Sequence, residues 1–140
     1  MGFRRQQGNN CYNGWECCVQ SVVSGSNITF YQCDLASPAP IHETSAAIRS
    51  DLGNLSILIN NAGVARPSTI IDETDEFVER IFKVNIISHS ILIKEFLPTM
   101  LKQQKGHIVS IASVGSYMSG PPLVNYCATK AAVLSLHEGL

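Results

Sequence analysis

The stretch LSILINNAG, from Leu55 to Gly63, decides the fold class. Its apolar first half is typical of a strand buried on both faces, and its polar second half is typical of a turn. A similar apolar run, His107–Ala112, follows after a long helical pattern. A strand, a helix and a second strand in this order predict two parallel strands, because parallel neighbours need a long connection.

The preceding part of the chain predicts one more strand and one more helix. Ile28–Cys33 alternates and is rich in β-branched and aromatic residues, so we expect a strand that ends at Asp34. Ser37 and Pro38 form a helix-start signal, and Gly53 ends that helix. The apolar residues on one face of this helix are Ile41, Ile48 and Leu52.

The longest helical pattern follows an acidic first turn at Asp72–Asp75 and runs to Pro98, which we expect to bend or nearly end the helix. One side of it carries Phe77, Ile81, Val84, Ser88, Leu92 and Phe96. A last helix is expected from about Val124 to the end of the chain. Three strand–helix repeats predict an α/β fold with parallel strands and helices on both faces of the sheet.

Composition excludes several classes of protein. The 140 residues suffice for one domain, and 45% apolar against 15% charged residues excludes a disordered chain. A net charge of −1 lacks the excess of basic residues that is typical of nucleic-acid-binding proteins. We find no stretch near the roughly 18 apolar residues of a transmembrane helix and no secretory signal after Arg4 and Arg5. The five cysteines lack the spacing of a metal or thiol-exchange site, so we expect a cytoplasmic domain in a reducing compartment, without a metal.

The first 27 residues differ from the rest of the chain. They contain four of the ten glycines, three of the five cysteines and the only tryptophan, without sustained periodicity. We therefore divide the chain into an atypical N-terminal segment, 1–27, and a domain, 28–140. A substitute strand around Cys17–Val23 has no specific signal in the sequence.

Four polar residues stand where an α/β sheet binds ligands, near the carboxyl ends of strands. Tyr126 and Lys130 are four apart on a predicted helix, so both project from one face. Ser113 follows a strand, and Asn85 lies inside the apolar long helix. Taken singly, each has an ordinary explanation as a surface pair, a turn former or an amide bonded to backbone. Together they favour a site, because a nearby ammonium makes a phenol a more useful base.

Five motifs follow one another along the chain: Cys33-Asp34-Leu35, Asn60-Asn61-Ala62-Gly63, Asn85, Ser110-Ile111-Ala112-Ser113 and Tyr126-Cys127-Ala128-Thr129-Lys130. With these motifs, the chain from Ile28 to Leu140 resembles the central part of a short-chain dehydrogenase/reductase, and Leu123–Ala132 resembles the branch acting on lipophilic alcohols such as retinol and hydroxysteroids. The resemblance implies a Rossmann-like, doubly wound parallel sheet, here incomplete. It also implies an NAD(P)-dependent oxidoreductase that transfers hydride between a nicotinamide cofactor and a secondary alcohol or ketone, or a lipophilic alcohol or aldehyde. The choice between NAD and NADP stays open.

The resemblance also implies roles for individual residues. Tyr126 would be the acid/base, and Lys130 would favour its phenolate and bind the nicotinamide ribose. Ser113 would hold the substrate oxygen, and Asn85 would hold a water linked to Lys130. Residues expected to contact the cofactor are Asp34 and Leu35 at the adenine, Asn60, Ala62 and Gly63 at the adenosine, and Tyr126 and Lys130. The resemblance also implies a homodimer through the long helix and the Tyr126 helix. For full-length members of that branch, association with a membrane or a lipid droplet is an alternative to the cytoplasmic location.

The sequence departs from the family pattern at both ends. The family opens with a strand, a Thr-Gly-x-x-x-Gly-x-Gly turn, a helix and a second strand, and it continues after the Tyr-bearing helix with further strands. Neither part is found, so cofactor binding loses a large contribution. With the family strand order 3-2-1-4-5-6-7, the strands kept here would form one parallel pair with bare edges and one detached strand. We therefore expect a fragmentary gene product or gene model, with a non-coding origin of residues 1–27 as part of that hypothesis.

Two alternatives belong to other functional classes. The first is a catalytically inactive remnant that at most pairs its exposed strands with another chain. The second is a thiol or metal module built on Cys11, Cys17, Cys18 and Cys33. The second is disfavoured because their spacing matches no zinc pattern and no histidine lies nearby.

Overall fold

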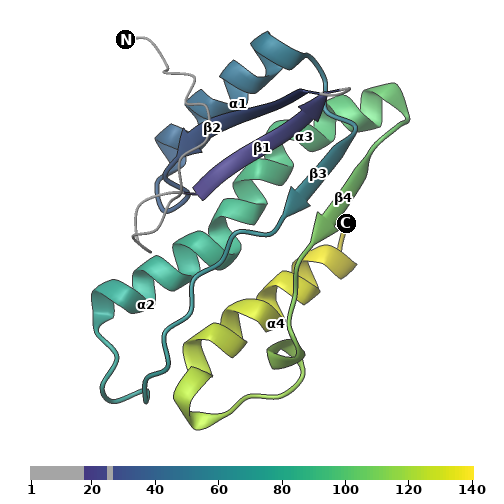
Figure 1. The fold of residues 1–140 in the computed structure, drawn as a ribbon. Coiled ribbons are helices and arrows are strands. Elements are labelled where there is room, and N and C mark those ends of the chain that lie inside the picture. The colour runs from purple at the N-terminus through teal and green to yellow at the C-terminus, as the bar shows by residue number, and fades with distance from the viewer. Residues whose placement is uncertain (1–17, 25–26) are drawn as a thin grey trace.

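The computed structural model describes residues 18–24 and 27–140, in which strands and helices alternate after an initial strand pair (Figure 1). The elements are β1 (Cys18–Ser24), β2 (Asn27–Cys33), α1 (Pro38–Leu52), β3 (Ile57–Asn60), α2 (Asp75–Phe82), the π-helical turn Lys83–Ile87, α3 (Ser88–Gln103), β4 (His107–Ser110) and α4 (Val124–Glu138). Two 3-10 turns, Val114–Ser116 and Pro121–Leu123, connect β4 to α4. The predicted order of strands and helices from residue 28 onward is confirmed.

The strands within residues 18–24 and 27–140 form two separate two-stranded sheets. β3 and β4 are parallel, with Ile57 opposite His107 and Asn60 opposite Ser110. β1 and β2 are antiparallel, with Cys18 opposite Cys33. The parallel pair and the separation of β2 from it agree with the sequence prediction. The pairing of β1 with β2 adds a strand that the sequence did not indicate.

β3 differs from its prediction in position and in burial. It begins at Ile57 rather than Leu55, and it alternates between buried and exposed residues. Leu58 is buried, whereas Ile57 and Ile59 are 59% and 60% exposed. The predicted burial on both faces is therefore wrong, because none of the described elements covers the face that carries these two isoleucines.

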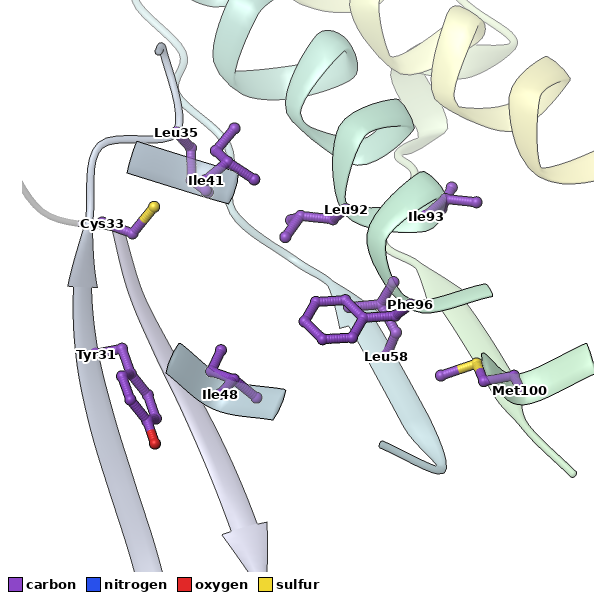
Figure 2. Close-up of a cluster of buried hydrophobic side chains, with 10 residues drawn as sticks. All are labelled: Tyr31, Cys33, Leu35, Ile41, Ile48, Leu58, Leu92, Ile93, Phe96 and Met100. Atoms are coloured by element: carbon purple, nitrogen blue, oxygen red, sulfur yellow. The ribbon is translucent and has the colours of Figure 1, made fainter. Parts of the chain in front are cut away.

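The hydrophobic core lies between β2, α1, β3 and α3 (Figure 2). Figure 2 shows Tyr31 and Cys33 of β2 and Ile48 of α1 facing the side chains of Leu58 and Phe96. Each fully buried large apolar side chain contributes roughly 1.5–3 kcal/mol relative to exposure. This cluster joins the antiparallel unit to the parallel pair, since no strand of the described residues belongs to both sheets.

The predicted apolar stripe of the long helix is confirmed. Its members are all buried: Phe77, Ile81, Val84, Ser88, Leu92 and Phe96. The Thr74 side chain caps the helix start by accepting from the Phe77 N–H at 3.3 Å, and Asp75 and Glu76 supply the acidic first turn. The stripe continues through the π-helical turn, which joins α2 to α3 without a break.

Pro98 does not end the long helix, so that alternative is wrong, and the expected bend stays a prediction. α3 continues to Gln103 and ends at Gln104, which has φ of 50°. A proline inside a helix removes one backbone hydrogen bond and costs about 3 kcal/mol. The buried side chains of Phe96 and Met100, on either side of Pro98, hold this last part of the helix on the core.

Gly106 lies against Met100 where the chain leaves α3 for β4. A Cβ at position 106 would lie 2.5 Å from the Met100 Cβ, which cannot move without its helix. We expect Gly106→Ala to lower the free energy of unfolding by about 1–3 kcal/mol, measured by urea titration. At Gly120 the nearest atom would be 3.9 Å away, so Gly120→Ala should be close to neutral. Equal losses in the two variants would contradict the tight contact.

An ion-pair cluster joins α1 to α3. Glu95 lies 2.7 Å from His42 Nδ1, and its other carboxylate oxygen accepts from Arg49 at 2.7 Å. Arg49 also donates to the Glu95 carbonyl and lies over the Phe96 ring. Burial alone would raise the pKa of Glu95, but hydrogen bonds and charge from Arg49 and His42 outweigh it and hold the pKa below its usual value.

This lowered pKa predicts a pH-dependent contribution to stability. The contribution is fully present above the ordinary glutamate pKa of about 4.3 and is lost as the pH falls through the lower folded-state value. We expect Glu95→Gln to cost at most about 1 kcal/mol at pH 7, because the cluster is partly exposed. The difference from the unchanged protein should shrink steadily in urea titrations as the pH is lowered below about 4.3. A difference that stays constant across this range would contradict the assignment.

Candidate active site

The candidate site lies at the carboxyl ends of β3 and β4. β3 ends at Asn60 and leads into Asn61-Ala62-Gly63, and β4 ends at Ser110 and leads to Ser113. Because the two strands are parallel, both connections leave from the same edge of the sheet, as Figure 1 shows. α4, which bears Tyr126 and Lys130, packs against the 3-10 turn that follows Ser113.

Asn85 joins the long helix to both neighbouring parts of the site. Its Oδ1 accepts from the Val64 N–H at 2.8 Å, and its Nδ2 donates to the Val64 carbonyl and to Thr129 Oγ1, each at 3.0 Å. It is fully buried within the π-helical turn, a feature often found at functional sites. Its side-chain amide therefore fixes the connection after β3 to α4, and its role in holding a water stays a prediction.

Lys130 is the charged group of the site, and only 4% of it is exposed. Its Nζ donates to the Ile111 carbonyl at 2.6 Å and lies 5.9 Å from the centre of the Tyr126 ring. Burial lowers the pKa of Lys130 from its usual value. A Cβ at Gly63 would lie 3.7 Å from Nζ and 3.5 Å from Asn85 Oδ1, so the glycine turn passes directly over both groups.

Ser113 begins the 3-10 turn after β4 and is held by it. Its Oγ accepts from the Gly115 N–H at 3.1 Å, and its own N–H donates to Ser116 Oγ at 3.3 Å. A Cβ at Gly115 would lie 3.4 Å from Ser113 Oγ and 3.7 Å from a Tyr126 ring carbon. The Ser113 hydroxyl and the Tyr126 ring therefore both lie beside Gly115.

The predicted adenine-side residues lie apart from this group. Asp34 is held within the turn that precedes α1, because its carboxylate accepts from the Ala36 N–H at 3.1 Å and the Ser37 hydroxyl at 3.0 Å. The Leu35 side chain is buried in the hydrophobic core. Both residues follow β2, which belongs to the other sheet, and no hydrogen bond within the described ranges joins Asp34 to the Lys130 group.

Asn60 supplies a test of whether this edge suits a nucleotide. It is buried, yet neither its Oδ1 nor its Nδ2 has a hydrogen-bond partner in the part of the chain that the structure describes. Buried polar groups are usually paired, and an unpaired amide offers both a donor and an acceptor. Together with the close approach at Gly63, this makes the residues fit a polar cofactor beside the glycine turn.

His89 is a site residue that the sequence analysis missed. It is 1% exposed, and neither ring nitrogen reaches a partner at hydrogen-bond geometry among the described residues. Burial lowers the pKa of His89 to about 4, the adjacent Ala62 backbone partly counters this, and the Lys130 charge adds to it. Its position four residues after Asn85 on the buried stripe is the signal that could have found it.

Glu73 is a second residue that the sequence analysis missed. It lies between the two loops that border the site, which are residues 61–74 after β3 and residues 111–123 before α4. Glu73 accepts from Arg66 at 3.2 and 3.3 Å and from Asn125, the neighbour of Tyr126, at 3.2 Å. Arg66 also lies over the Phe77 ring at 4.2 Å. These contacts fix the loop after β3 to the start of α4. The same two loops carry exposed apolar side chains at Ile70, Ile71, Val114, Tyr117 and Met118.

The described residues show little that supports the thiol or metal module. No group of three or more His, Cys, Asp or Glu side chains in residues 18–24 and 27–140 is arranged to hold a metal ion. Cys33 is a buried free thiol whose pKa is raised by burial. Cys11 and Cys17 lie outside the described residues, and the Cys18 side chain is not described. Among the described helices, none is long and apolar enough to span a bilayer.

These features define an α/β domain of the Rossmann-like class, with polar groups gathered at the carboxyl ends of its parallel strands. The chain belongs to the short-chain dehydrogenase family, whose model matches residues 12–140. The match begins within the segment that we separated on composition, and the division at residue 27 stays a prediction.

Comparison with individual proteins places the chain among dehydrogenases. It is 44% identical over 119 residues to Dehydrogenase RED3 of Cochliobolus heterostrophus, covering 85% of this chain and 61% of that protein. It is 38% identical over 110 residues to Retinol dehydrogenase 10 of Rattus norvegicus, covering 79% and 32%. A solved short-chain dehydrogenase from Sphingobium yanoikuyae in complex with NADPH is 35% identical, with a TM-score of 0.71 and coverage of 78% and 42%. The chain therefore spans under two thirds of the length of each.

The hydrogen bonds of Asn85 predict a large effect of its loss. Asn85→Ala removes the hydrogen-bond partner of the partly buried Val64 N–H and carbonyl and of the buried Thr129 hydroxyl. We expect the free energy of unfolding to fall by about 2–3 kcal/mol in urea titrations. Asn54→Ala, at an exposed asparagine, is the matched control and should change it by less than about 0.5 kcal/mol. Similar losses in both variants would contradict the role of Asn85 in fixing the loop.

Proposed function

We propose that this chain carries the acid–base residues of an NAD(P)-dependent oxidoreductase. The reaction transfers hydride between a nicotinamide cofactor and a secondary alcohol or ketone, or a lipophilic alcohol or aldehyde. The observation that carries the proposal is the approach of Lys130 and Ser113 to Tyr126 at the carboxyl ends of β3 and β4. Membership of the short-chain dehydrogenase family supports the reaction class.

In the proposed mechanism, Tyr126 and Ser113 act on the substrate oxygen. In the direction of oxidation, the Tyr126 phenolate takes the hydroxyl proton while the carbon loses a hydride, so the C–O single bond becomes a carbonyl. The Ser113 hydroxyl donates to the same oxygen, and the Lys130 ammonium favours the phenolate by its charge. A nicotinamide cofactor, held at its ribose by Lys130, would supply the hydride acceptor. In the direction of reduction each transfer runs in reverse.

The proposed cofactor contacts follow the two strand ends. Asn60, Ala62 and Gly63 would line the adenosine, and the unpaired amide of Asn60 supports this. Asp34 would accept from the adenine amino group, whereas Leu35 would contribute only its backbone, because its side chain lies in the core. Lys130 would bind the nicotinamide ribose, and Asn85 would hold a nearby water. NAD and NADP are both candidates.

A lipophilic substrate is the finer part of the proposal. The loops that border the site expose Ile70, Ile71, Tyr117 and Met118, which offer apolar contact area. The similarity to Retinol dehydrogenase 10 supports the same class of substrate. A homodimer through the long helix and α4 belongs to this proposal as well.

The second candidate function is a non-catalytic one, in which the chain pairs its strands with another chain. The open parallel pair and the exposed Ile57 and Ile59 favour it. Cofactor binding separates the two candidates, since only the first requires it.

The test measures cofactor binding and turnover in the full chain. NADH and NADPH are titrated to millimolar concentration while nicotinamide fluorescence is followed, and turnover is measured with retinoid and steroid carbonyl compounds. We expect Tyr126→Phe to lower turnover by at least about 100-fold and to weaken cofactor binding far less, because the substitution removes only the hydroxyl group. Tyr31→Phe, a tyrosine whose hydroxyl bonds to Asp51 away from the site, is the matched control. No fluorescence change with either cofactor would reject the oxidoreductase proposal in favour of the strand-pairing one.

A further inference from the structure

We propose that Ser116 is a positioning residue that fixes Ser113 relative to the helix bearing Tyr126 and Lys130. This inference rests on the proposed function, because the spacing of these three residues matters only if they act on one substrate. Ser116 belongs to none of the motifs that carry the family resemblance.

One hydroxyl group makes both connections. The Ser113 N–H donates to Ser116 Oγ at 3.3 Å, and the same Oγ donates its proton to the Lys130 carbonyl at 2.9 Å. The Ser116 N–H in turn donates to the Ser113 carbonyl at 2.9 Å, which closes the 3-10 turn. Ser116 therefore holds the backbone of Ser113 on one side and the backbone of α4 on the other.

This link is independent of the Lys130 ammonium. The other polar link between the strand end and Lys130 is the hydrogen bond from Nζ to the Ile111 carbonyl. That bond uses the group that we propose for the cofactor ribose, whereas the Ser116 bond uses only the Lys130 backbone. The hydrogen bonds through which Ser116 positions Ser113 therefore do not depend on which group the Lys130 ammonium binds.

The 3-10 turn Val114–Ser116 packs tightly on α4, so its position affects the distance between Ser113 and Tyr126. A Cβ at Gly115 would lie 3.0 Å from Cys127 Sγ and 3.7 Å from the Tyr126 ring, so the turn lies directly on α4. Ser113 Oγ is itself oriented by the Gly115 N–H. A shift of this turn along α4 therefore changes the separation of the Ser113 hydroxyl from Tyr126. An ordinary capping serine bonds only within its own turn, whereas Ser116 also bonds to another helix.

Amide hydrogen exchange, measured residue by residue by NMR on the full chain, tests the link without requiring turnover. In Ser116→Ala the Ser113 N–H loses its acceptor, and we expect it to exchange about 5- to 10-fold faster. Core amides should exchange as before, and Ser116→Thr, which keeps a hydroxyl, should restore the protection of Ser113. Ser119→Ala, at an exposed serine of the same loop, is the control and should change nothing. Unchanged exchange at Ser113, equal acceleration of all amides, or no restoration by threonine would each overturn the proposal.

Turnover and cofactor affinity give the second readout. We expect Ser116→Ala to lower kcat about tenfold while nicotinamide fluorescence reports the same cofactor affinity within about twofold. A change in affinity with unchanged kcat would overturn the positioning role. The two proposals fail differently: absence of cofactor binding in the unchanged chain contradicts the proposed function, and normal Ser113 exchange in Ser116→Ala contradicts only the role of Ser116.

Discussion

The hydrogen bond from the Lys130 ammonium to the Ile111 carbonyl is the contact on which the candidate site depends. A buried ammonium is costly unless it is paired, and here its described hydrogen-bond partner is a backbone carbonyl just past the end of β4. That bond joins α4 to the sheet edge, and the Gly63 turn passes over the same ammonium. The position of the charge is therefore set by strand, helix and turn together.

Asn85 holds the site from the long helix, as the Lys130 ammonium holds it from α4. Its amide holds Val64 and Thr129, so the loop after β3 and α4 are fixed to one point of the long helix. That point is a π-helical turn, which places the amide and the following His89 on the buried side. Because α2, the turn and α3 form one continuous helix, Asn85 lies on the same helix as the core residues Leu92, Phe96 and Met100. This helix therefore borders both the site and the core.

The sequence predicted what depends on periodicity and missed what depends on contacts between distant residues. The stripe from Phe77 to Phe96 and the parallel pair follow from local pattern and connection length. The continuation of α3 past Pro98 was not predicted, because the packing of Phe96 and Met100 outweighs the local cost of a proline. Ile57 and Ile59 have the composition of a fully buried strand, and composition does not reveal whether a second layer covers it. Ser116 and Glu73 are ordinary polar loop residues in sequence, and only their partners in α4 give them a role.

The arrangement also separates the groups that would govern proton transfer from the residue that would contact the adenine. The groups that would govern proton transfer lie on helices and loops at one sheet edge, and their contacts involve Ile111, Asn85 and Ser116. Asp34, by contrast, lies at the end of β2 in the other sheet and is joined to this edge through the hydrophobic core. A change in the packing between α1 and α3 would therefore alter the distance between the two parts while leaving the hydrogen bonds around Lys130 intact. The adenine contact proposed for Asp34 and the protonation chemistry of Tyr126 and Lys130 should for this reason respond to different substitutions, since different contacts hold them in place.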